Sequence, residues 1–172
     1  NLSFGTEATK FESALKDIGE LLGYISQRPD KEIRKGPDNL WCGSNNYYLL
    51  FEYKSEVSET RQEITKHEAG QMNNHCAWFE DQYGQDAKTD RFMIIPTKNL
   101  SYEGDFTHDV RIIRRNRLKS LKDQIKGFVK ELKPYSLDEL SDTTLQELLA
   151  LHHLNIEDFS AQYSEEYYHK AK

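Results

Sequence analysis

Residues 36–54 read GPDNLWCGSNNYYLLFEYK and carry the strongest structural signal in the chain. A short strand is predicted at 38–42, and the polar stretch 43–46 is typical of a turn. A long apolar strand is predicted to follow at 47–54. Two strands joined by a tight turn favour a β-hairpin.

The hairpin is expected to gather three charged side chains at one edge. Side chains two residues apart on a strand point to the same face, so Glu52 and Lys54 project together. The turn lies near the middle of the stretch, and folding about it brings Asp38 beside them. Two carboxylates that converge repel each other unless a cation lies between them, and Mg²⁺ accepts one or two protein carboxylates. Such a site activates water and neutralises charge on a phosphoryl group, while Lys54 stabilises that charge, which indicates phosphodiester hydrolysis.

Helices and further strands are predicted around the hairpin. Apolar residues at three- and four-residue spacing predict helices at 6–25, 60–83 and 114–132. A Leu-rich helical stretch at 137–154, a polar helix or tail at 156–170, and strands at 92–96 and 110–113 complete the pattern. This order predicts an α/β (α+β) fold. We divide the chain into a core at 1–113 and a helical C-terminal extension at 114–172, packed on or beside the core.

Composition excludes some classes of protein. The 172 residues are 37% hydrophobic and 12% aromatic, which argues against disorder. No apolar run approaches the roughly 18 residues that span a bilayer. The two cysteines, Cys42 and Cys76, form no disulfide framework and suit a reducing compartment, so a cytoplasmic location is expected. The net charge of −6 argues mildly against nucleic-acid binding over the whole surface.

The motif Gly36-Pro37-Asp38, followed by Glu52-Tyr53-Lys54, resembles the PD-(D/E)XK nuclease superfamily, which has the restriction-endonuclease-like fold. The resemblance covers about residues 8–96 and implies a mixed four-stranded sheet flanked by helices, Mg²⁺ or Mn²⁺, and DNA cleavage. The sequence around the motif, with GPDNLW and later Trp78-Phe79, resembles nuclease domains joined to bacterial DEAD/DEAH-box helicases. Such nuclease modules often occur in mobile or antiviral systems.

The resemblance also implies roles for individual residues. Asp38, Glu52 and the backbone carbonyl of Tyr53 are expected to bind the metal, although related sequences often have a small residue at the Tyr53 position. Glu12 on the first helix matches an acid that several members add to the metal site, and Glu20 competes for that role. The expected catalytic residues are Asp38, Glu52, Lys54 and Gln71.

Gln71 lies on the predicted helix after the hairpin, where many members place a supporting Gln or Glu. The alternative is a core glutamine bonded to backbone, and Glu68, about one turn away, is a further candidate. His67, His75 and Cys76 match no closed zinc site, so packing is the preferred interpretation.

A basic stretch stands out in this acidic chain. Residues 111–130 contain eight Lys or Arg and one acid, Asp123. A solvated helix face is the common explanation for such a run. The contrast with the net charge favours a surface that contacts phosphates and positions a nucleic acid without reading its sequence. The residues expected to do so are Arg114, Arg115, Arg117, Lys119 and Lys122.

The predicted function is therefore a metal-dependent deoxyribonuclease, with RNA as an open alternative substrate. A second hypothesis is a catalytically inactive module that binds nucleic acid or assembles with a helicase or another subunit of a defence system. A homodimer is also compatible with this class of nuclease, and no dimer surface is legible in the sequence.

Overall fold

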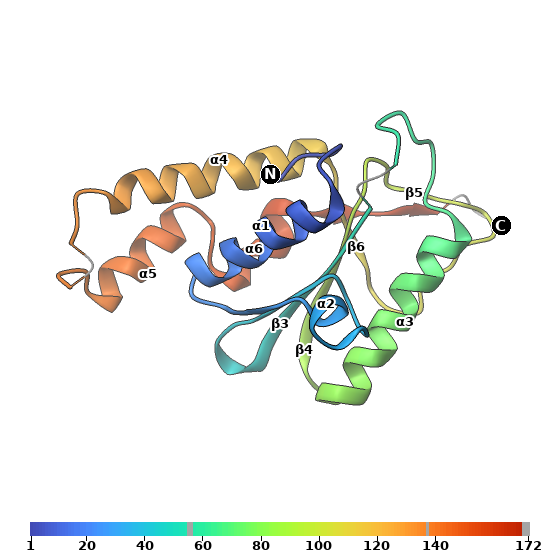
Figure 1. Cartoon of the computed structure of the whole chain (residues 1–172), viewed down its shortest axis with the longest axis horizontal. Coiled ribbons are helices and arrows are strands. Elements are labelled where there is room, and N and C mark those ends of the chain that lie inside the picture. Colours follow the sequence, from blue (N-terminus) through green and yellow to red (C-terminus); the bar gives the residue numbers. More distant parts are fainter. Residues whose placement is uncertain (55–56, 137, 170–172) are drawn as a thin grey trace.

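The computed structural model describes residues 1–54, 57–136 and 138–169. Over these residues the fold is mixed α/β, built on a six-stranded sheet in the order β1-β2-β3-β4-β6-β7 (Figure 1). The strands are β1 (Ile25–Gln27), β2 (Asn39–Cys42), β3 (Tyr47–Tyr53), β4 (Lys88–Ile94), β6 (Arg111–Ile113) and β7 (Glu165–Glu166). The pairs β3–β4 and β4–β6 are parallel, and the other pairs are antiparallel, so the sheet is mixed.

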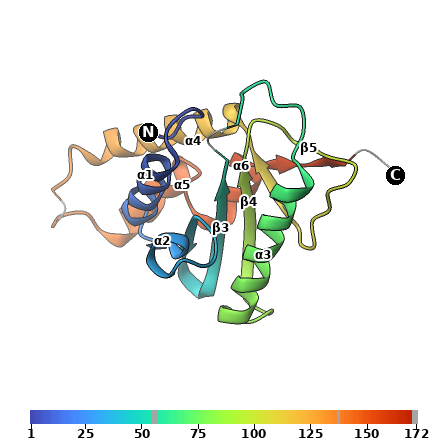
Figure 2. The same cartoon turned by 45° about the vertical axis from the view of Figure 1, so that its right-hand side comes forward.

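Helices cover both faces of this sheet (Figures 1 and 2). One face carries α1 (Ala8–Leu21), α4 (Arg115–Leu132), α5 (Asp142–Leu151) and α6 (Ile156–Tyr163). The other face carries α3 (Lys66–Tyr83). The short helix α2 (Pro29–Ile33) and the 3₁₀ turn η1 (Ser44–Asn46) lie in connections, and β5 (Asn99–Leu100) pairs with β8 (Tyr168–His169) in a second, two-stranded sheet. No helix in the described ranges is long and apolar enough to cross a membrane.

The strand period distributes side chains between two cores. On β3, Leu49, Phe51 and Tyr53 enter the core under α1, α4, α5 and α6. Leu50 enters the core under α3. Because successive residues on a strand alternate in direction, Glu52 points to the same side as Leu50, toward α3. The alternation therefore places this carboxylate on the face covered by one helix.

The predicted hairpin is confirmed: β2 and β3 pair antiparallel, with Asn39 opposite Phe51. The expected four-stranded sheet is wrong, because the described residues form six strands in the main sheet. The additional strands β1 and β7 have three and two residues. Segments this short show no periodicity, and they become strands because a neighbouring strand offers them backbone hydrogen-bond partners.

Residues 114–172 pack against the sheet in the described part of that range. Phe159 of α6 contacts Trp41, Phe51 and Phe92 edge-on, with ring centroids 5.5–5.8 Å apart. The same segment supplies β7 to the sheet edge beside β6. The C-terminal helices and the hairpin thus share one core.

Candidate functional site

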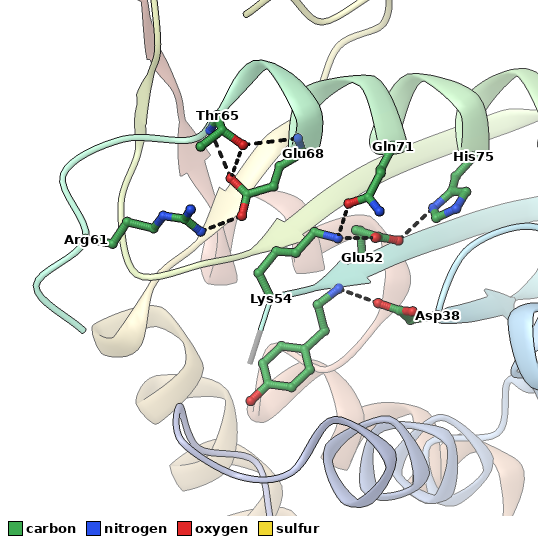
Figure 3. A network of polar contacts seen from close by, with 9 residues as sticks. Asp38, Glu52, Lys54, Arg61, Thr65, Glu68, Gln71 and His75 are labelled. Atoms are coloured by element: carbon green, nitrogen blue, oxygen red, sulfur yellow. Dashed lines mark hydrogen bonds and ion pairs between the residues drawn. The ribbon is translucent and has the colours of Figure 1, made fainter. Parts of the chain in front are cut away.

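Lys54 connects the end of β3 to α3. Its Nζ donates to Glu52 Oε1 at 2.7 Å and to Gln71 Oε1 at 2.8 Å (Figure 3). The prediction that Glu52 and Lys54 share a face is confirmed by this contact. Gln71 lies in the second turn of α3 and faces the sheet, so three of the predicted catalytic side chains are in direct contact.

Asp38 reaches the same group from the start of β2. Its Oδ2 accepts a hydrogen bond from the backbone N–H of Tyr53 at 2.7 Å, which fixes the carboxylate beside the end of β3 (Figure 3). Gly36 sets up this approach with a φ of +87°, and a Cβ there would come within 2.7 Å of the Trp78 ring. A residue without a side chain is therefore needed two positions before Asp38.

The electrostatics of Asp38 are unusual. Burial, reinforced by the negative charge of Glu52, raises the pKa of Asp38 to about 7 from an ordinary value of 3.8. The charge of Glu12 acts in the same direction, while the Tyr53 N–H and the charge of Lys54 oppose it. The charge of Glu52 is thus close enough to disfavour the ionised form of Asp38, a repulsion that a cation between them would relieve.

Glu52 is the most enclosed acid of the group, with 3% of its surface exposed. Its second oxygen, Oε2, lies 2.7 Å from His75 Nδ1 (Figure 3). Burial alone would raise the pKa of Glu52, but the contacts with His75 and Lys54 outweigh it and hold that pKa below its usual value. Burial likewise works against the charged form of His75, but Glu52 raises the pKa of His75 overall. The Glu52 carboxylate therefore lies between the Lys54 ammonium group and the His75 imidazole, and both contacts favour its ionised form.

His75 is the residue that the sequence interpretation missed, because it was assigned to packing. It follows Gln71 by four positions, so both lie on the same face of α3. That face had to meet the sheet beside Glu52, and a polar residue on it needed a partner. The four-residue spacing from Gln71 to His75 was therefore the signal that could have identified this residue.

Glu12 lies on the same side of the molecule, but its carboxylate already has a partner. It forms an ion pair with Arg28, and both side chains are largely buried. Asn39 Nδ2 donates to the Glu12 backbone oxygen at 3.0 Å and so ties α1 to β2. Arg28, just before α2, was not singled out in the sequence. The structure places Glu12 near Asp38 with its own charge compensated.

The further candidate Glu68 has a structural role at the start of α3. Its Oε2 accepts from the backbone N–H of Thr65 at 2.9 Å, and the Thr65 hydroxyl accepts from the Glu68 N–H (Figure 3). This reciprocal arrangement is a capping box, and it explains why the helix predicted from residue 60 begins at Lys66. Glu68 also pairs with Arg61.

The acidic residues of this site fit a divalent cation in part. Asp38 and Glu52 offer two neighbouring carboxylates, and carboxylate oxygens are the hard ligands that Mg²⁺ prefers. No group of three or more His, Cys, Asp or Glu side chains in the described ranges is arranged to hold a metal ion. A metal here would rest on these two acids, on backbone or water oxygens, and on Glu12 if it exchanged its partner.

The five predicted nucleic-acid-binding residues separate into two groups. Arg114 Nη2 donates to Glu165 Oε2 at 3.0 Å, and Arg117 Nη1 donates to the Gln162 backbone oxygen at 3.1 Å, so both hold the C-terminal segment. The other three contact residues outside the C-terminal segment. Arg115 forms an ion pair with Glu59, Lys119 forms one with Asp123, and Lys122 donates a hydrogen bond to the Ser3 hydroxyl.

Comparisons with protein-family models, curated proteins and solved structures found no match to the chain. The resemblance to the PD-(D/E)XK superfamily thus stays a prediction from the motif, and the functional argument rests on the geometry of Asp38, Glu52, Lys54, Gln71 and His75.

Proposed function

We propose that the chain is a metal-dependent nuclease that hydrolyses DNA phosphodiester bonds. The observation that carries the proposal is the meeting of Asp38, Glu52 and Lys54 at the end of β3, with Gln71 behind them. Asp38 immediately precedes β2, Glu52 lies in β3, Lys54 immediately follows β3 and Gln71 lies in α3, so the fold gathers residues from three elements and their ends. Buried charges are retained where they are paired or do chemistry, and this group contains both signs.

The reaction is hydrolysis. A water oxygen forms a bond to phosphorus, the bond from phosphorus to one ester oxygen breaks, and a proton ends on the departing oxygen. Lys54, held between Glu52 and Gln71, donates hydrogen bonds to the phosphoryl oxygens or orients the water. His75 is a positioning residue that holds the second oxygen of Glu52.

Asp38 and Glu52, with the Tyr53 carbonyl and Glu12, are the groups that would hold Mg²⁺ or Mn²⁺. Bound there, the ion supplies Lewis-acid activation of water and neutralisation of phosphoryl charge. Asp38 must be ionised to bind it, and a pKa of about 7 makes that step easy near neutral pH and costly in acid.

A second candidate function has its own supporting observation. Both oxygens of Glu52 already have partners, Lys54 and His75, and the carboxylate of Glu12 pairs with Arg28. A polar cluster that satisfies its own charges also suits a protein that has kept the fold without the chemistry. In that case the chain is a nucleic-acid-binding or assembly module of a larger helicase or defence system.

The test is cleavage of plasmid and linear DNA with Mg²⁺ or Mn²⁺. Asp38→Ala and Lys54→Ala should each lower the rate by at least about 100-fold, because each removes a group that acts on the transition state. Lys66→Ala, at an exposed lysine that begins α3, should cut like the parent. Equal rates in all four proteins would refute the assignment of the site.

Calorimetry with Mn²⁺ separates the two candidate functions. A nuclease site binds Mn²⁺ in the parent and loses that binding in Asp38→Ala. An assembly module shows no heat that depends on Asp38, and no cleavage with either ion. Circular dichroism of each variant confirms that the fold is intact.

A further inference from the structure

A groove runs between the N-terminal segment and the first turns of α4, which lie side by side in both views (Figures 1 and 2). Its volume is about 340 Å³. Residues 2–4 form one wall, and α4 forms the other. Four cationic side chains of α4 line it, against the single acid Asp123: Arg115, Lys119, Lys122 and Lys126.

The four cations form one row on the helix. They are spaced four, three and four positions apart, which keeps them on a single face. At a rise of 1.5 Å per residue the row extends about 16 Å. A row of this length faces several successive phosphates of one nucleic-acid strand. A regular row of cations over this length suits a polymer of regularly spaced anions.

The present partners of these cations are replaceable. Lys119 pairs with Asp123 at 2.8 Å, where both side chains are mostly exposed, and Lys122 donates to the Ser3 hydroxyl at 2.9 Å. Lys126 makes no hydrogen bond or ion pair to the residues that the structure describes. Exposed pairs of this kind are weak in water, so a phosphate can displace them at little cost. Arg114 and Arg117, by contrast, are engaged with the C-terminal segment.

Two contacts link the groove to the candidate active site. The Tyr53 hydroxyl donates to the Ser3 backbone oxygen at 3.2 Å, and Tyr53 stands between Glu52 and Lys54 in the chain. Arg115 forms an ion pair with Glu59, which lies in the segment that follows Lys54. The groove therefore lies close to the end of β3, on the face of the sheet opposite the Glu52 side chain.

We propose that this groove binds the sugar-phosphate backbone of a nucleic-acid strand. The proposal rests on the proposed function, since the strand is the nuclease's substrate. The apolar side chains of the groove, Leu2, Phe4 and Leu118, are 3–9% exposed and so offer no face for bases to stack on. The contacts are thus to phosphates, and binding is independent of base sequence. DNA and RNA share this chemistry, and the experiment below distinguishes them.

The test measures fluorescence anisotropy of short labelled single-stranded DNA and RNA in EDTA, where nothing is cleaved. Lys119→Gln/Lys126→Gln should weaken binding at least about tenfold at low salt. The slope of log affinity against log salt should become shallower by about 1.4, which is the loss of two phosphate contacts on a single strand. A loss with DNA alone, RNA alone or both identifies the strand that the groove accepts.

The matched control is Lys31→Gln/Lys35→Gln, which removes the same charge at exposed lysines away from α4 and outside the groove. It should leave the slope unchanged. Unchanged binding in the groove variant, an equal loss in the control, or competition by inorganic phosphate as effective as by the oligonucleotide would overturn the proposal. If the parent protein binds the oligonucleotide in EDTA but never cleaves it with Mn²⁺, the groove proposal stands and the nuclease proposal fails. If it cleaves DNA but the groove variant binds as tightly as the parent, the nuclease proposal stands and the groove proposal fails.

Discussion

Two lysine–carboxylate pairs in this molecule have nearly the same length and very different surroundings. Lys54 and Glu52 meet at 2.7 Å with 15% and 4% of their side chains exposed. Lys119 and Asp123 meet at 2.8 Å with 76% and 52% exposed. The first pair also contacts Gln71 and His75 from another element, whereas the second lies within one helix.

The comparison teaches that distance alone does not rank ion pairs. Water and salt screen the exposed pair, and each of its partners is well solvated without the other. Removing one partner of the buried pair leaves a charge that water cannot reach, and the penalty is correspondingly large. The buried pair can therefore serve chemistry and the exposed pair can exchange its partner for a phosphate.

The largest expected effect comes from removing the buried cation. Lys54→Ala should lower the free energy of unfolding by about 2–4 kcal/mol, since Glu52 then keeps only His75 and Gln71 loses its donor. Lys119→Ala, the matched change on the surface, should leave urea denaturation almost unchanged. Equal losses in the two variants would show that burial does not separate the pairs.

The second prediction disturbs the geometry around the buried group. Gly36→Ala should destabilise the fold by about 1–3 kcal/mol, because a positive φ and contact with Trp78 both oppose a Cβ. It should also lower any metal-dependent cleavage, since Gly36 positions Asp38. Gly70→Ala on α3, where nothing lies within 4 Å of the added carbon, should be neutral or stabilising. Thermal melts of both variants decide the matter.

The third prediction concerns pH. The pKa of Asp38 is about 7 in the folded chain and near its ordinary 3.8 when unfolded, so the folded state binds more protons between these values. The contribution of Asp38 to stability therefore falls as pH rises from about 4 to about 7. The charged groups that act on it are Glu52, Glu12 and Lys54. Asp38→Asn, which can still accept from the Tyr53 N–H, removes this dependence.

Urea titrations with EDTA give the free energy of unfolding of Asp38→Asn relative to that of the parent. This difference should be about 1–3 kcal/mol more favourable to the variant at pH 8 than at pH 5. The Asp38 charge also raises the pKa of His75, so the same pair of titrations in a His75→Gln background removes that contribution. A difference that is the same at both pH values would contradict the raised pKa.

The smallest expected effect is the response to salt. A double-mutant cycle on Lys119 and Asp123 should give a small coupling that disappears near 1 M salt, where the screening length is about 3 Å. The same cycle on Lys54 and Glu52 should keep most of its coupling. Survival of the surface coupling in high salt would remove the distinction between the two regions.

Local sequence patterns were sufficient for part of the fold and of the site. The hairpin followed from a turn between two apolar runs, and the shared face of Glu52 and Lys54 followed from the strand period. Gln71 was singled out by the resemblance to the PD-(D/E)XK nucleases, and in the structure it contacts Lys54. The short strands β1 and β7 were missed, because two or three residues carry no period.

The sequence by itself determined which side chains share a face of one element, since that depends only on the periods of helix and strand. Tertiary structure decided the partners across elements: His75 on Glu52, Arg28 on Glu12 and Arg114 on Glu165. It also raised the pKa of Asp38, because burial and a neighbouring charge exist only after the chain has packed. Periodicity is local, whereas dielectric environment and charge neighbours belong to the whole fold.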